Sequence, residues 1–104
     1  MNATQSIPIL ITLDPASIAR QAMEWPWWHA LRINDVDGTM TVNCDHPTSS
    51  KGMVKELTPD DWAAALQLMV ERAPGRLKHV LVPEDAASCD LLLQFAVYGE
   101  EVWA

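Results

Sequence analysis

A β-hairpin is the clearest prediction from the sequence, and it falls on residues 31–44, which read LRINDVDGTMTVNC. Apolar and polar side chains alternate over residues 31–34 and again over residues 39–44, and this period of two is typical of strands with one buried face. Residues 35–38 lie between the two runs, and Gly38 is free to adopt a positive φ. The stretch therefore predicts two antiparallel strands joined by a tight turn.

Toward the C-terminus, a third strand and a helix are predicted. A polar loop at residues 46–52 precedes an alternating run at residues 53–57, which is typical of an edge strand. Residues 58–61, TPDD, supply a hydroxyl cap, a proline at the first helical position and two carboxylates at the positive helix end. The expected buried stripe of this helix is Trp62, Ala65, Leu66 and Met69, and Pro74-Gly75 ends it.

The C-terminal part predicts one more helix. Residues 76–82 fit either a short helix or a strand, closed by Pro83. Glu84-Asp85 then opens a helix in which residues 91–98 are apolar nearly all round, and Gly99 ends it. Such a helix is buried on several sides or against a partner.

The N-terminal part begins with a polar stretch, residues 1–6, expected to be a frayed leader. Residues 7–13 are apolar, but no basic residue precedes them and no small-residue cleavage site follows, so they do not predict a signal peptide. Asp14-Pro15 begins a helix with Ile18, Ala22 and Trp25 as its stripe, which Pro26 stops near Glu24. The order α-β-β-β-α-(α)-α predicts one α+β domain over residues 1–104, a three-stranded antiparallel meander covered by helices.

Composition excludes several functional classes. Fourteen Asp and Glu against seven Lys and Arg give a formal charge of −7, whereas a binder of nucleic-acid backbones needs a basic face. No run approaches the ~20 apolar residues of a membrane-spanning helix. Cys44 and Cys89 are too few for a disulfide framework and are interpreted as thiols of a cytoplasmic protein, with a single bridge between them left open. No nucleic-acid partner, membrane or cofactor is expected.

Catalytic and metal sites are incomplete in the sequence. Cys44, Asp45 and His46 lie together, with His29 at the start of the neighbouring strand, but the spacing matches no zinc template. A thiolate–imidazolium pair would also need an orienting group and an oxyanion donor, and neither can be assigned. The strand pattern places Cys44 on the buried face, where its reactivity falls.

Carboxylates and tryptophans remain as candidate binding groups. Asp90 lies in an apolar helix and needs a partner if buried, so it is expected to face Arg20, Arg32 or solvent. Trp25, Trp27 and Trp28 cannot all point inward from so short a segment, which leaves core and interface open for Trp27 and Trp28.

One resemblance rests on residues 57–62, 66–71 and 89–103. The Leu-Thr helix start and the closing pattern Asp-x-x-Leu-Gln-x-Ala-x-x-Gly-Glu resemble a family of small proteins of unknown function encoded by phages, prophages and plasmids. Trp27-Trp28 stands where that family usually has Tyr-Trp, and its Lys-Tyr-Pro-x-His stretch is replaced by residues 72–76. The resemblance implies an origin in a mobile element and no catalytic residues.

The resulting hypothesis is a non-enzymatic accessory protein that binds a host protein. Residues 59–104 carry eight acids and three bases, so an acidic face of the anti-CRISPR or DNA-mimic type is expected to occupy a basic groove of a nucleic-acid-processing or defence complex. The expected partner-binding residues are Trp27, Trp28, Glu84, Asp85, Asp90, Glu100, Glu101 and Trp103. Two alternatives stay open: a self-associating module, with a homodimer formed through residues 91–98, and a small enzyme or metal protein using Cys44, His46 and His29.

Overall fold

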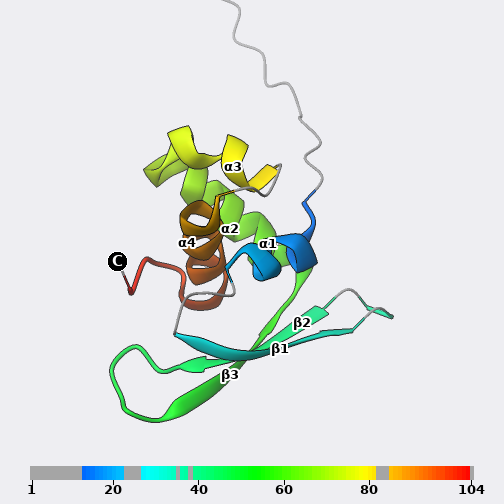
Figure 1. The fold of residues 1–104 in the computed structure, drawn as a ribbon, viewed down its shortest axis with the longest axis vertical. Coiled ribbons are helices and arrows are strands. Elements are labelled where there is room, and N and C mark those ends of the chain that lie inside the picture. The colour runs from blue at the N-terminus through cyan, green and yellow to red at the C-terminus, as the bar shows by residue number, and fades with distance from the viewer. Residues whose placement is uncertain (1–12, 23–26, 35, 38, 82–84, 104) are drawn as a thin grey trace, which may run out of the picture.

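A computed structural model describes residues 13–22, 27–34, 36, 37, 39–81 and 85–103. Its elements follow the order α-β-β-β-α-α-α, with a short 3₁₀ turn before the third helix. The α+β prediction is therefore confirmed. Figure 1 shows the helices gathered on one side of a twisted three-stranded sheet.

The sheet consists of β1 (Trp28–Asn34), β2 (Thr39–Asp45) and β3 (Gly52–Leu57), all antiparallel, with β2 in the middle. Val42 is paired with Leu31 on one side and Lys55 on the other, so these residues share the face that the helices cover. The strand expected from Leu31 starts three residues earlier, because Trp28 already pairs with Cys44 across an irregularity in the register.

The first two helices follow their capping signals. In α1 (Pro15–Gln21), Asp14 accepts a hydrogen bond from the Ser17 backbone. This helix was expected to end near Glu24 but ends earlier, and residues 23–26, which include Trp25, lie outside the described residues. In α2 (Pro59–Arg72), the Thr58 hydroxyl and the Asp61 carboxylate form a capping box.

The remaining elements are η1 (Pro74–Arg76), α3 (Lys78–Leu81) and α4 (Ala86–Tyr98). The ambiguous segment is thus helical over Lys78–Leu81. Gly99 ends α4 in the left-handed region at φ 74°, as its position predicts.

The core is built around α4, where every residue from Ser88 to Val97 is buried. Trp62, Ala65 and Met69 of α2 pack into this core as expected, while Leu66 is half-buried. Because α1, α2 and α3 all pack on α4, the predicted homodimer through residues 91–98 lacks an exposed face on this helix. None of the helices in the described part combines the length and apolar character that crossing a membrane requires.

Candidate partner-binding site

The expected partner-binding residues separate into different environments. Trp27 is 2% exposed and Asp90 is 5% exposed, so neither offers a surface to another protein. The Trp27 indole N–H donates to the Asp90 carboxylate, which also accepts from Gln94 Nε2 at 2.7 Å. Asp90 therefore faces an indole and an amide, not Arg20, Arg32 or solvent, and the open question for Trp27 is answered in favour of the core.

Trp103 joins the same network from the C-terminal tail. Its ring stacks on Trp27 with centroids 6.1 Å apart and planes within 6°, and it packs at a tilt against Tyr98. It is half-buried. The four side chains Trp27, Asp90, Gln94 and Trp103 are called the tail clamp below, because they fix the tail to α4.

Gln94 is the central residue of the tail clamp and was not singled out in the sequence. Its Oε1 accepts from the backbone N–H groups of Val102 and Trp103, both at 2.8 Å, and its Nε2 donates to the Trp103 carbonyl at 2.8 Å. One buried amide thus satisfies three backbone groups of the tail as well as Asp90. The signal that could have found it is a glutamine inside an otherwise apolar helix, where an unpaired amide would be costly.

Burial raises the pKa of Asp90 above its ordinary value. Removal from water disfavours the carboxylate most strongly, and the hydrogen bonds from Trp27 and Gln94 offset only part of that cost. The negative charge of Glu101 raises this pKa further. The Asp90 carboxyl group therefore accepts hydrogen bonds inside the protein, and its ionisation is costly.

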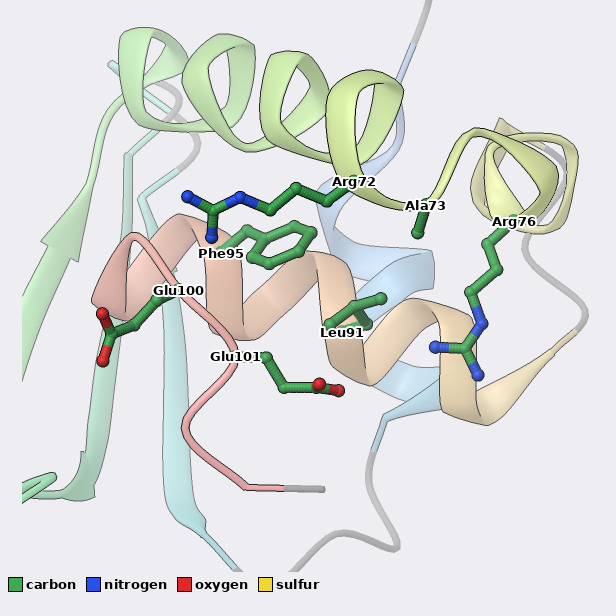
Figure 2. A pocket seen from close by; sticks show the side chains of 7 residues that line it. All are labelled: Arg72, Ala73, Arg76, Leu91, Phe95, Glu100 and Glu101. Carbon is green, nitrogen blue, oxygen red and sulfur yellow. The ribbon is translucent and has the colours of Figure 1, made fainter.

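A pocket of about 620 Å³ lies beside the tail clamp, between the end of α2, η1, α4 and the tail (Figure 2). Leu91 and Phe95 of α4 form its floor, and the charged residues Arg72, Arg76, Glu100 and Glu101 surround it. This set of residues is called the rim pocket below. It contains two of the expected partner-binding residues, Glu100 and Glu101.

Local backbone structure explains why these charges meet. Arg72 is the last residue of α2, and the turn Pro74–Arg76 carries Arg76 along the same side of the molecule. Gly99 reverses the chain at the end of α4, and the clamped tail then runs back beside Phe95 and Leu91 (Figure 2). Sequence reasoning missed the two arginines because they come from a different part of the chain.

The rim pocket charges make no ion pairs with one another. Within the described ranges, His29 Nε2 lies 2.7 Å from Asp45 Oδ1, and no ion pair involves Arg72, Arg76, Glu100 or Glu101. Both glutamates and Arg72 are exposed, while Arg76 is half-exposed. Charges of both signs therefore surround an apolar floor without neutralising each other.

The remaining expected partner-binding residues lie elsewhere. Trp28 is half-buried and donates its indole N–H to the Ala22 carbonyl at 3.1 Å. Asp85 accepts from the Ser88 hydroxyl at 2.6 Å, and this hydrogen bond lowers the pKa of the Asp85 carboxyl. It acts at the start of α4, and Glu84 lies outside the described residues.

The cysteine and histidine candidates are also dispersed. Cys44 and Cys89 are buried free thiols, so the bridge left open between them is not formed. Burial raises the pKa of Cys44, and it raises that of Cys89 to about 11, which keeps both thiols protonated near neutral pH. His29 and His46 are exposed, and the described residues contain no group of three His, Cys, Asp or Glu side chains placed to hold a metal ion.

The chain matches no protein-family model, no curated protein and no solved structure at a significant level. Its similarity to the phage and plasmid family stays a prediction.

Proposed function

We propose that the chain is a non-enzymatic protein-binding module and that its rim pocket grips a segment of a partner protein. The observation that carries this proposal is the convergence of Arg72, Arg76, Glu100 and Glu101 on one hollow without ion pairs among them. Charges that form no ion pair with another described residue gain most when a partner supplies the complementary charges.

The arrangement of charges also predicts which side chains a partner would present to the pocket. An Asp or Glu of the partner would lie against the guanidinium groups of Arg72 and Arg76. A Lys or Arg of the same segment would lie against the exposed carboxylates of Glu100 and Glu101. Because the pocket carries charges of both signs, it favours a partner surface of mixed charge. The sequence alone suggested a uniformly basic groove of a nucleic-acid-processing or defence complex.

The tail clamp supports this role by holding the pocket in place before the partner arrives. Glu100 and Glu101 lie between Gly99, which ends α4, and Val102, whose backbone N–H is bound to Gln94. A segment fixed in advance loses less conformational entropy on binding than a free one, and this raises affinity. The resemblance to the phage and plasmid family supports a host protein as the partner, with the chain acting as an accessory or inhibitory protein.

Affinity purification with matched charge variants tests the proposal. The wild-type chain, Glu100→Lys/Glu101→Lys and Arg72→Glu/Arg76→Glu are used as baits in bacterial lysate, and bound proteins are quantified by mass spectrometry. We expect one protein that the wild type retains and both reversals lose, with binding that weakens as salt rises. The control Glu56→Lys/Glu71→Lys changes net charge as much as the glutamate reversal but lies outside the pocket, so it should retain that protein. Equal recovery by all baits would contradict the proposal.

A further inference from the structure

The side of the sheet away from the helices carries a charged row that crosses all three strands. Arg32 of β1 is paired with Thr41 of β2, and Thr41 is paired with Glu56 of β3. Directly paired residues point to the same side of a sheet, so these three side chains share one face. Side chains alternate along β2, so this face is opposite to the one that carries the buried Val42, where the helices lie (Figure 1).

A second row lies beside the charged one on the same face. Ala30 is paired with Asn43, and Asn43 is paired with Val54, whose side chain is 68% exposed. The two rows together are called the outer face below: Ala30, Arg32, Thr41, Asn43, Val54 and Glu56. All of these residues except the half-buried Thr41 are exposed, so the described part of the chain leaves this face open.

The two charges of the outer face are free to meet a partner. Within the described ranges, no ion pair involves Arg32 or Glu56. The two residues lie on strands β1 and β3, whose backbones are about 10 Å apart because β2 lies between them. The charged row also lines a hollow of about 530 Å³, which leaves room for long side chains of a partner. A surface with the same two charges at the same spacing, in reversed order, would pair both of them.

A second copy of the chain has this surface. A two-fold axis parallel to β2, between two sheets packed face to face, places β1 of one copy over β3 of the other. Arg32 of each copy then faces Glu56 of the other, and in the next row Val54 of each copy faces Ala30 of the other. An axis at right angles to the strands would place β1 over β1 and would not bring Arg32 opposite Glu56. The charge pattern therefore favours the axis parallel to β2.

We propose that two copies of the chain pair through their outer faces, with Arg32 of each copy against Glu56 of the other. Sheets that pack face to face lie about 10 Å apart, a distance that an arginine and a glutamate side chain span together. Three short strands cover about 300–400 Å² per copy, less than half of the roughly 800 Å² of a standard interface. The dimer is therefore weak and reversible, with an expected Kd of about 0.1–1 mM.

This dimer is independent of the rim pocket, which lies among the helices on the other side of the sheet (Figure 1). The Glu56→Lys change in the control bait should weaken the pairing of copies and leave the rim pocket as it is. Either proposal can therefore fail without the other.

Sedimentation equilibrium of the full chain, up to a concentration of about 1 mM, tests the proposal. Arg32→Glu and Glu56→Arg should each raise the Kd by about tenfold or more, because like charges then face each other twice. Glu56→Arg also makes this acidic chain less negative, so general charge repulsion alone would strengthen its association. The double variant Arg32→Glu/Glu56→Arg keeps the net charge of −7 and both ion pairs, so its Kd should stay within about threefold of the wild type.

An equal mixture of the two single variants gives the most specific test. In a mixed dimer, the introduced glutamate of one chain faces the introduced arginine of the other, and the native Glu56 of the first faces the native Arg32 of the second. The mixture should therefore associate like the wild type, although each variant alone does not, and an interaction within one chain cannot produce this recovery. Circular dichroism checks that both variants are folded. A wild type that stays monomeric at about 1 mM, single variants that associate like the wild type, or a mixture without recovery would each overturn the proposal.

Discussion

The tail clamp and the rim pocket use the same few residues of the C-terminal tail in opposite ways. Inside, Gln94 satisfies the backbone of Val102 and Trp103. Outside, Glu100 and Glu101 line the same pocket as Arg72 and Arg76 and form no ion pair with them. Buried polar groups that are fully paired fix one structure, whereas exposed charges without partners contribute little to stability and remain free for recognition. The difference predicts that substitutions in the clamp alter stability and substitutions in the pocket alter binding.

The largest expected effect comes from removing the indole at the centre of the clamp. Trp27→Ala should lower the free energy of unfolding by about 3–5 kcal/mol, because a buried ring is lost and Asp90 loses a donor. The neighbouring Trp28→Ala should cost less, about 1–2 kcal/mol, since Trp28 is only half-buried. Chemical denaturation of both variants measures the difference. Equal losses of unfolding free energy would show that the clamp contributes no more to stability than a half-buried neighbour.

A smaller effect is expected from the amide that holds the tail. Gln94→Ala should cost about 2–3 kcal/mol, because the backbone groups of Val102 and Trp103 lose their buried partner. The tail should then detach locally, so amide exchange at Val102 and Trp103 rises more than exchange in α2. Unchanged protection of these two amides would show that Trp103 stacking alone holds the tail.

The sequence predicted the elements better than the sites. Helix caps and strand periodicity are local, so Asp14, Thr58 and Gly99 mark real helix ends. The clamp and the rim pocket bring together residues far apart in the chain: Trp27 bonds to Asp90 across 63 positions, and Arg72 and Glu100 line one pocket although η1, α3 and α4 lie between them in the sequence. No local pattern in the sequence encodes those pairings. The sequence alone therefore predicts Trp27 as an anchor for a partner and does not predict Arg72 as a binding residue.

The clamp also predicts a pH dependence of stability. The pKa of Asp90 is raised in the folded state, so folding favours the protonated carboxyl. Its contribution to stability is fully present below the unfolded pKa of about 4 and is lost as the pH rises through the higher folded value. Asp90→Asn removes this titration, and its amide faces the Gln94 donor at every pH. We expect wild type to lose stability relative to Asp90→Asn as the pH rises above about 4 in unfolding titrations. A difference in unfolding free energy between the two proteins that stays constant with pH would contradict a raised pKa of Asp90 in the folded state.

The smallest effect on stability is expected in the rim pocket, and this is the sharpest contrast with the clamp. Glu100→Lys/Glu101→Lys should change the free energy of unfolding by no more than about 0.5 kcal/mol, because both side chains are exposed and neither forms an ion pair with a residue that the structure describes. The negative charge of Glu101 raises the pKa of Asp90. Replacing Glu101 with lysine should therefore lower that pKa and slightly favour the ionised Asp90 carboxylate. Denaturation curves of the wild type and the reversal should therefore overlap while partner capture differs. A loss comparable with that of Gln94→Ala would mean that these glutamates hold the tail in place, and the separation between a clamp that stabilises and a pocket that binds would fail.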